Sequence, residues 1–389
     1  MDKILKYIED KTKGETYKSH RFCFDSEFHL PSLTYEDPTE FNLVKDQSAE
    51  TDDKLKESKN VRQLAVKLQG KPLFRYFLDG SRRVYKIDDI KFGDRLFPIV
   101  GGQIGVACCE RQSPSTFSNA LMQKHIVIAL PSLAGSEGGS HSKLFFNNMV
   151  AEINKSSHLE RFGIKFSEIL TYVSNKNDNG KKEEYMDRGT AQIQDKMIEC
   201  EQGLVVQLTQ KNLLNEDNYL IKDGSLQYQS KSKGFTLENA QTRTNYRRVV
   251  GISKAFNPEL SKSRNGKSNA ANIANLPLYH RTPAAKYQDS RMGNVFFAIW
   301  YVRIREKKYT ESPFAGILKI EKILVTDYEI ENGIESTEVD QITANIINER
   351  SPVCYGNDQR WANHLYPVYL TEKYIKSLFL SDSHFLNLF

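Results

Sequence analysis

The tripeptide Asp-Gly-Ser occurs twice in this 389-residue chain, each time directly after a short run of aromatic and branched residues. The first copy begins at Asp79 and follows residues 73–78, and the second begins at Asp223 and follows residues 219–222. Such runs predict strands, and each glycine predicts the turn that ends its strand. One Asp-Gly pair would be ordinary turn chemistry. Two copies predict two carboxylates held at the ends of buried strands, where a metal ion could bind.

Other apolar stretches predict the rest of the fold. Runs rich in apolar residues predict strands over residues 99–109, 124–130, 249–254, 295–304 and 316–325. Helices are predicted over residues 1–11, 61–68, 187–208, 338–350 and 370–380. Short connections between the first three strands predict an antiparallel meander. The pattern predicts an α/β fold, in which a mixed sheet is flanked by helices, with insertions and with helical extensions at both ends.

The chain is long enough for two or three average domains or for one elaborated domain. We predict an N-terminal helical and irregular extension over residues 1–70, a main domain over 71–380 and a tail over 381–389. Within the extension, the polar stretch 44–59 predicts a surface connection or an exposed helix. Two polar insertions, 174–187 and 257–275, are predicted to be flexible.

The cellular location follows from two negative observations. No apolar stretch approaches the ~20 residues that a bilayer-spanning helix needs, and the N-terminus lacks a signal-peptide pattern. The five cysteines are an odd number without a C-x-x-C motif, which fits a reducing compartment. We therefore expect a cytoplasmic protein that does not bind membranes.

Positive charge is concentrated in one part of the chain. Residues 229–286 hold eleven Lys or Arg and two acids, a balance of +9, whereas the whole chain carries +5 and the remainder therefore −4. Such a block predicts contact with a phosphate backbone, although a solvated, flexible basic loop has the same composition. The cations expected to bind DNA are Arg82, Arg247, Arg248, Lys254 and Arg281.

The helix predicted over residues 187–208 carries an acid on its apolar face. Ile193, Met197 and Leu204 define that face, and Glu201 falls four residues after Met197. Glu199 points about 200° away at ~100° per residue. A buried carboxylate is costly unless it is paired or bound to a metal. Glu201 is therefore expected to be a metal ligand, unless this face of the helix is wetter than the pattern indicates.

In chain order the sequence thus presents Asp79, Glu201 and Asp223, which could converge at one edge of the sheet. Carboxylate oxygens suit Mg²⁺ or Mn²⁺. Two such ions about 4 Å apart can activate water and stabilise the leaving oxygen in phosphodiester cleavage. Lys254, the last residue of a predicted strand, could neutralise the charge of the phosphate.

These segments resemble the NurA nuclease family. The similarity lies in Phe-Leu-Asp-Gly-Ser at 77–81, a helix acid, Asp-Gly-Ser-Leu at 223–226, Val-Val-Gly-Ile-Ser-Lys at 249–254, Trp-Tyr-Val-Arg at 300–303 and Tyr-Pro-Val-Tyr-Leu at 366–370. The six motifs are short, but they are collinear over about residues 73–376.

The resemblance implies an RNase H-like core and Mn²⁺-dependent DNA cleavage, both as a 5′-to-3′ exonuclease and as a single-strand endonuclease. It implies a homodimer that docks on a HerA-like hexameric ATPase, in DNA end processing or phage defence. Asp79, Glu201 and Asp223 would be the metal ligands, with two ions expected. Tyr366 would be the family's C-terminal tyrosine.

The chain departs from the family pattern at one position. A histidine often lies eight residues after that tyrosine, and here the position holds Tyr374. His364 or Glu372 could replace it. Two other functions remain open: an RNase H-like nuclease that acts on RNA or DNA without a motor, and a non-catalytic DNA-binding adaptor.

Overall fold

The structure is a computed structural model of the chain. It describes residues 3–17, 21–24, 41–135, 143–174, 184–227, 239–263, 265–289, 295–310, 312–350 and 361–389. Most of the predicted insertion 174–187 lies outside these residues. In the described part, no helix is long and apolar enough to cross a membrane.

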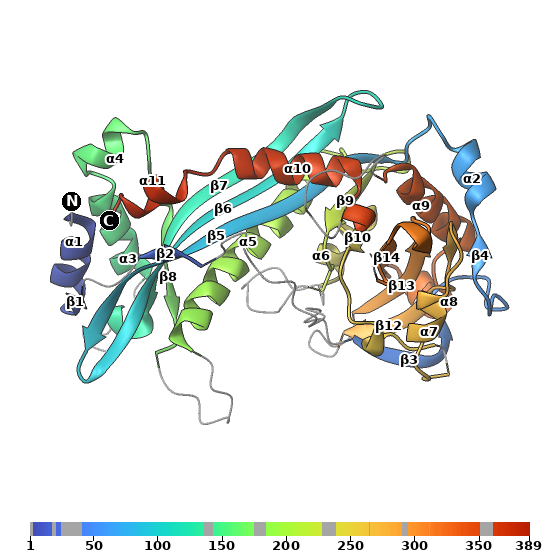
Figure 1. Ribbon diagram of the computed structural model, residues 1–389, viewed down its shortest axis with the longest axis horizontal. Coiled ribbons are helices and arrows are strands. Elements are labelled where there is room, and N and C mark those ends of the chain that lie inside the picture. Colours follow the sequence, from blue (N-terminus) through green and yellow to red (C-terminus); the bar gives the residue numbers. More distant parts are fainter. Residues whose placement is uncertain are drawn as a thin grey trace.

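One large mixed sheet organises the molecule (Figure 1). From edge to edge the strand order is β3 (Phe41–Ser48), β12 (Ala285–Asp289), β13 (Phe296–Arg303), β14 (Ile317–Ile323), β10 (Val249–Ser253), β9 (Tyr219–Asp223), β5 (Phe74–Phe92), β6 (Arg95–Arg111), β7 (Phe117–Pro131) and β8 (Glu168–Tyr172). Four short strands pair beside this path: β1 (Glu15–Tyr17), β2 (Phe22–Cys23), β4 (Lys59–Asn60) and β11 (His280–Arg281). The pairs β5–β9, β9–β10 and β7–β8 are parallel, and the other pairs are antiparallel. The prediction of an α/β fold with a mixed sheet flanked by helices is confirmed.

Helices cover both faces of this sheet and its two ends. The α-helices are α1 (Lys3–Thr12), α2 (Arg62–Lys67), α3 (Lys143–Ile153), α4 (Ser157–Arg161), α5 (Tyr185–Gln210), α6 (Ala240–Thr244), α7 (Ala270–Ala274), α8 (Asp327–Asn332), α9 (Ser336–Asn348), α10 (Tyr366–Ser377) and α11 (Asp382–Leu386). Short 3-10 helices lie at η1 (Ser132–Gly135), η2 (Pro258–Leu260), η3 (Lys307–Tyr309) and η4 (Trp361–Asn363). In Figure 1, α5 and α10 run along opposite sides of the long strands β5–β7.

The strand that holds the first Asp-Gly-Ser is much longer than predicted. β5 passes straight through residues 79–81 and ends at Phe92, so the expectation that Gly80 ends it is wrong. The reason is pairing: β6 matches β5 residue by residue, Asp79 opposite Ala107 and Gly80 opposite Val106. Because the ladder satisfies the backbone of Gly80, a turn there has no advantage. The antiparallel meander itself, β5–β6–β7, is confirmed.

The N-terminal segment and the tail both join the main body. The polar stretch 44–59, predicted as a connection or a helix, includes the second half of the edge strand β3, which pairs with β12. At the other end of the chain, Phe385 of α11 is fully buried and stacks on Tyr85 of β5 at a ring distance of 4.2 Å. The insertion 257–275 contains η2, α7 and a β-bridge between Lys262 and Ser268.

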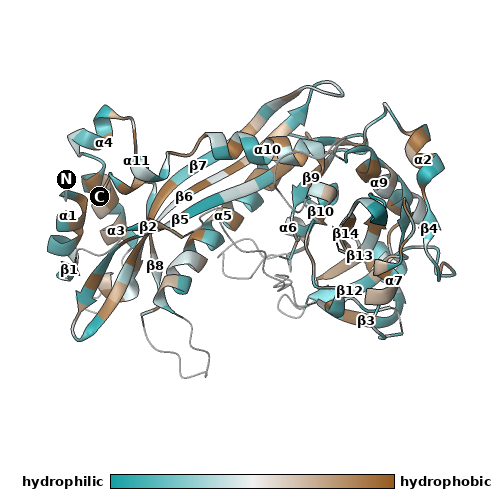
Figure 2. Ribbon diagram, viewed as in Figure 1, coloured by the Kyte–Doolittle hydropathy of each residue, from teal (hydrophilic) through white to brown (hydrophobic). Residues whose placement is uncertain are grey.

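Two apolar cores lie on the two faces of the central strands. Successive residues of a strand point to opposite faces, and the buried residues divide accordingly. Leu78 of β5 belongs to the core that contains the apolar face of α5. Phe77 of β5 and Ile221 of β9 belong to the other core, with Val368 of α10. Figure 2 shows apolar residues as brown segments along the strands and helices. We call the two sides the α5 face and the α10 face.

Candidate metal and nucleic-acid site

The structure places Asp79 and Asp223 next to each other on the α10 face. The parallel pairing of β5 and β9 matches Leu78 with Lys222, so the two aspartates occupy the next position on neighbouring strands. Strands in a sheet lie about 4.8 Å apart. Asp79 shares the face of Phe77, and Asp223 shares that of Ile221. Two carboxylates far apart in the sequence therefore lie on neighbouring strands and on the same face of the sheet.

A lysine completes this pair. Lys254 directly follows β10, and its Nζ lies 3.0 Å from Oδ2 of Asp223. Its side chain is only 7% exposed, which is rare for an ammonium group without an acid nearby. Burial alone would lower the pKa of Lys254, but the charges of Asp223, Asp79 and Glu372 outweigh burial and raise it. Lys254 is thus held as a cation among carboxylates.

Asp79 is a buried carboxylate, and the positive charge near it does not fully offset its burial and the charge of Asp223. The residue is 5% exposed, and Oδ1 accepts a hydrogen bond of 2.8 Å from the backbone N–H of Gly80. Burial raises the pKa of Asp79 well above its usual range, and the charge of Asp223 raises it further, although Lys254 opposes both. A bound cation would offset the burial and the repulsion together.

Helix α10 contributes a further acid on this face. Thr371 is fully buried and its hydroxyl donates to the carbonyl of Phe77 at 3.5 Å, which places the helix over β5. The next residue, Glu372, raises the pKa of both Asp79 and Lys254 through its charge. Its Oε1 also lies 3.0 Å from Nζ of Lys376. Of the two residues considered as substitutes for the family histidine, Glu372 is therefore the one that lies near the acid pair.

Glu201 is buried on α5, as the helical pattern predicts, but it lies on the other face of the sheet. A Cβ atom on Gly80 would come within 2.5 Å of Oε1 of Glu201, so the carboxylate lies against the α5 side of β5. The neighbouring Asp79 points to the opposite side. The prediction that three acids converge is thus wrong for Glu201, because sheet geometry separates adjacent positions.

Lys222 pairs with Glu201 on the α5 face. Oε2 of Glu201 lies 3.1 Å from Nζ of Lys222, as an ion pair without hydrogen-bond geometry. Burial raises the pKa of Glu201, and Lys222 partly offsets this. Glu199 is exposed and pairs with Lys196 at 3.2 Å. The helix acid that faces the sheet is therefore Glu201, and it already has a cationic partner.

The C-terminal tyrosines lie at the periphery of the acid pair. Tyr366 begins α10, is 36% exposed and stands edge-on to Phe117 at a ring distance of 6.3 Å. Tyr374 donates to the sulfur of Met122 at 3.7 Å. His364 is buried and stacks on Tyr369 at 5.6 Å. No described contact joins Tyr366 directly to Asp79 or Asp223.

The predicted DNA-binding arginines do not form one surface. Arg82 donates to Gln194 of α5 at 2.6 Å, on the α5 face. Arg247 is exposed, and Arg248 stacks over Tyr219 at 5.2 Å. Arg247 and Arg248 precede β10, whereas Lys254 follows it. A five-residue strand separates these ends by about 15 Å at 3.3 Å per residue, so of the predicted cations Lys254 is the one beside the acids.

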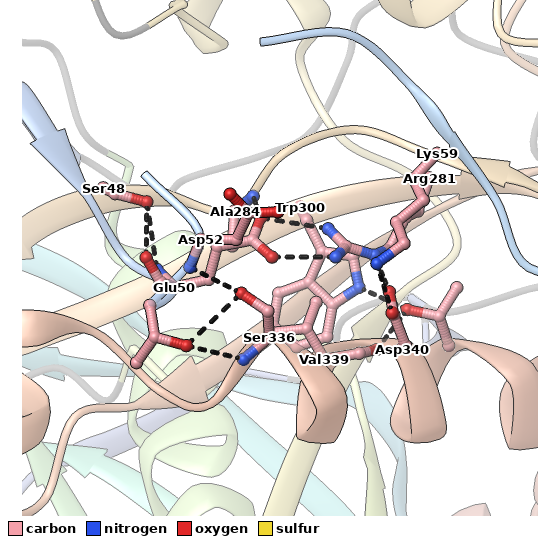
Figure 3. A network of polar contacts seen from close by, with 12 residues as sticks. Ser48, Glu50, Asp52, Lys59, Arg281, Ala284, Trp300, Ser336, Val339 and Asp340 are labelled. Atoms are coloured by element: carbon pink, nitrogen blue, oxygen red, sulfur yellow. Dashed lines mark hydrogen bonds and ion pairs between the residues drawn. The ribbon is translucent and has the colours of Figure 1, made fainter. Parts of the chain in front are cut away.

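Arg281 is part of the protein core and not of a nucleic-acid surface. It is 0% exposed, and Nη2 lies 2.7 Å from Oε2 of Glu50 while Nε lies 2.7 Å from Oδ1 of Asp340 (Figure 3). Lys59 also contacts Asp340 at 2.6 Å. Because this guanidinium is fully engaged, it cannot reach a phosphate without breaking the network. The prediction that Arg281 binds DNA is wrong.

Buried charged residues that the sequence analysis did not single out include Lys222, Lys319 and Glu321. The available signal was the alternation Ile-Leu-Lys-Ile-Glu-Lys-Ile over β14 and the lysine that precedes Asp223. Charged residues at every second position of an apolar strand predict one face that carries charge pairs. Glu321 is 0% exposed and Lys222 is 7% exposed.

The donor set fits a cation in part. In the described residues, no three His, Cys, Asp or Glu side chains lie close enough together to form a ready-made metal site. Asp79 and Asp223 do supply two adjacent carboxylates of the kind that bind Mg²⁺ or Mn²⁺, and the raised pKa of Asp79 indicates a deficit of positive charge. Glu201 does not fit, because Lys222 holds it on the other face.

Comparison with known proteins leaves the family unassigned. No protein-family model matches the chain. A search of curated proteins likewise finds no match.

Proposed function

We propose that this protein is a divalent-metal-dependent nuclease that cleaves DNA at the α10 face of its sheet. The observation that carries the proposal is the pair of adjacent carboxylates, Asp79 and Asp223, with the buried ammonium of Lys254 at 3.0 Å from Asp223. Burial and the charge of Asp223 raise the pKa of the Asp79 carboxyl, and a buried acid perturbed in this way is typical of functional sites. An RNase H-like core, a homodimer and a HerA-like motor belong to this proposal through the resemblance described above, and a cytoplasmic location belongs to it through the hydropathy and cysteine pattern of the sequence.

Asp79 and Asp223 would hold the ion, and Mn²⁺ or Mg²⁺ would supply Lewis acidity to the phosphate and to an attacking water. Lys254 stays protonated among the carboxylates and would bind a phosphate oxygen. Glu372 would orient water or complete the acid set from α10. The α10 face offers Asp79, Asp223 and Glu372 but not Glu201, so we propose one ion at this site, not two.

A second function, a DNA-binding adaptor without catalysis, is favoured by one observation. Both Glu201 and Asp223 already have lysine partners, at 3.1 and 3.0 Å. Ion pairs of this kind satisfy carboxylates without a metal. In the adaptor, Lys222 and Lys254 would be structural cations, and the surface alone would bind DNA.

Cleavage assays separate the two functions. The full chain is incubated with single-stranded DNA, duplex DNA and RNA of the same sequence, with Mn²⁺ or with EDTA. We expect Mn²⁺-dependent loss of DNA, abolished in Asp79→Asn/Asp223→Asn, while DNA binding by that variant persists in an anisotropy titration. Equal cleavage by the double variant would refute the site. DNA binding without cleavage under any cation would establish the adaptor, and cleavage of RNA alone would identify a different nuclease.

A further inference from the structure

A cluster of buried charges lies on the α5 face, directly behind Asp223. Its members are Lys222 of β9, Glu201 of α5, and Lys319 and Glu321 of β14, each less than 9% exposed. Removing four charges from water is costly, and apolar residues of the same size would pack this space with less cost. These four residues take no part in the cleavage chemistry proposed above. Their contacts with neighbouring residues indicate a different role.

The cluster surrounds the turn that follows Asp223. Gly224 has a φ of +81°, which sends the chain away from β9 and toward the α5 face. The turn continues to Leu226, which packs closely against Gly251. A Cβ atom added to Gly251 would lie 2.7 Å from Cγ of Leu226. Register places Lys222, Gly251 and Glu321 in one row across β9, β10 and β14. The glycine in the middle leaves room for the turn.

Glu321 forms the strongest contacts with this turn. Its Oε2 accepts two hydrogen bonds of 2.8 Å, one from the hydroxyl of Ser225 and one from the backbone N–H of Leu226. Its Oε1 lies 2.9 Å from Nζ of Lys319. Lys222 donates to the carbonyl of Ser225 at 3.2 Å. One fully buried carboxylate thus anchors the two residues that follow Gly224.

We propose that Glu321 is a positioning residue that sets the location of Asp223, a role that rests on the nuclease function proposed above. Asp223 is the last residue of β9, and among the described residues the ladder beyond it is continued by the bridge from Gly224 N to the Ile252 carbonyl at 2.8 Å. The carboxylate position therefore depends on where the turn is anchored. Supporting shells of this kind decide whether ligands are held tightly enough to bind a metal.

Three variants separate this role from simple stability. Glu321→Gln keeps an oxygen that can accept from Ser225 and Leu226 but removes the charge. Glu321→Leu removes both acceptors at similar volume. Ser225→Ala removes the hydrogen bond from Ser225 to Glu321, together with the one that its hydroxyl accepts from the N–H of Gln227 at 3.1 Å. It leaves every buried ion pair intact, so it remains informative if Glu321→Leu fails to fold. Glu349→Leu is the control, because Glu349 is also a buried acid with a cationic partner, Arg111 at 2.5 Å, and has no contact with this turn among the hydrogen bonds and ion pairs described.

The experiment measures Mn²⁺ binding to the full chain by calorimetry and amide exchange of the peptide that spans residues 219–227. We expect Glu321→Leu to weaken Mn²⁺ binding by 10-fold to 100-fold, on the order of other supporting-shell losses. Ser225→Ala should weaken it roughly threefold to tenfold, since one charge-assisted bond is lost. Glu321→Gln and Glu349→Leu should stay within about threefold of the parent, because both keep the turn's acceptors. Amide exchange in residues 219–227 should rise most in Glu321→Leu, less in Ser225→Ala and least in Glu321→Gln and Glu349→Leu.

The outcomes are distinct. If the parent binds Mn²⁺ and Glu321→Leu and Ser225→Ala bind it equally well, the positioning role is refuted while the metal site stands. If Glu349→Leu weakens binding as much as Glu321→Leu, the effect is general destabilisation and the role is again refuted. If the parent binds no Mn²⁺, the nuclease proposal fails. Amide exchange then decides whether Glu321 holds the turn: unchanged exchange in Glu321→Leu would reject that too.

Discussion

The carboxylates of Asp79 and Glu201 lie on opposite faces of one sheet, separated by the backbone of β5 at Gly80. Oε1 of Glu201 lies only 2.5 Å from the place that a Cβ of Gly80 would occupy, and Asp79, one residue earlier, points to the other side. Charge still acts across the sheet, since Glu201 contributes weakly to the raised pKa of Asp79. This arrangement divides the acids into a pair facing α10 and one facing α5.

Gly80→Ala should destabilise the protein, because the added methyl group overlaps Glu201 and comes within 3.2 Å of Met197. Overpacking of this kind costs about 1–3 kcal/mol, measurable as a lower urea midpoint. Gly203→Ala on α5 is the matched control, since its nearest neighbour would be 3.8 Å away. That change should stabilise the helix by up to about 1 kcal/mol. Equal effects of the two changes would contradict the close approach at Gly80.

Glu201→Gln should leave Mn²⁺ affinity within about threefold of the parent, whereas Asp223→Asn should lower it at least about tenfold. The reason is that Glu201 forms an ion pair with Lys222 on the α5 face and does not face the site formed by Asp79 and Asp223. Calorimetric titration of both variants checks this, with stability followed in parallel because an unpaired Lys222 is costly. A tenfold loss in Glu201→Gln would place that acid among the ligands after all.

Stability should fall as pH rises from about 5 to 7.5. Burial raises the pKa of Glu349 to about 7, and Arg111 only partly opposes this. A raised carboxyl pKa means that the folded state retains a proton that the unfolded chain releases above about pH 4.5. The free energy of unfolding therefore falls between about pH 4.5 and 7, by about 3 kcal/mol for a shift of this size. Urea unfolding at pH 5 and 7.5 measures the loss.

Glu349→Gln should flatten that pH dependence, because the amide cannot titrate. Asp79 and Glu201 also have raised pKa values, so a decline in the same direction should remain. An unchanged slope in Glu349→Gln would show that this carboxyl is not the group responsible.

Mn²⁺ binding should release protons, since the pKa of Asp79 is raised in the metal-free protein and a cation favours its ionised form. Calorimetry in two buffers of different ionisation enthalpy gives the number of protons released. The number should grow as pH falls and should vanish in Asp79→Asn. Proton release that persists in Asp79→Asn would assign it to another group.

Arg281→Met should lower stability with no direct effect on DNA affinity, whereas Arg247→Ala should leave stability within about 0.5 kcal/mol. Removing Arg281 strands the buried charge of Glu50, a loss of about 3–5 kcal/mol. Chemical unfolding measures the stability of the two variants, and fluorescence anisotropy of labelled DNA measures the DNA affinity of their folded fraction. If Arg281→Met folded normally and lost DNA binding, its assignment to the core would be incorrect.

Local patterns were sufficient for several elements. The spacing of Ile193, Met197 and Leu204 predicts α5 and correctly places Glu201 toward the sheet and Glu199 toward solvent. The same reasoning predicts the meander of β5–β7, because neighbouring residues supply both the apolar faces and the connections. What these patterns lack is any information about partners distant in the chain.

Arg281 illustrates that limit. In the sequence it stands in a basic block, and composition alone suggests a phosphate contact. Its real partners, Glu50 and Asp340, lie 231 and 59 residues away. The charge of a residue is evident from its type, but whether a protein carboxylate or a ligand neutralises it depends on the fold.

By itself, the sequence determined that strands would deliver Asp79 and Asp223 and that a helix would bury Glu201, since those outcomes depend on residue type and period. Only the tertiary structure decided which of these acids meet. Parallel register between β5 and β9 aligns the aspartates, and the two-residue period of a strand puts Glu201 behind Gly80 on the other face. Register is set by contacts between distant segments, so a single residue of slip would have reversed the assignment.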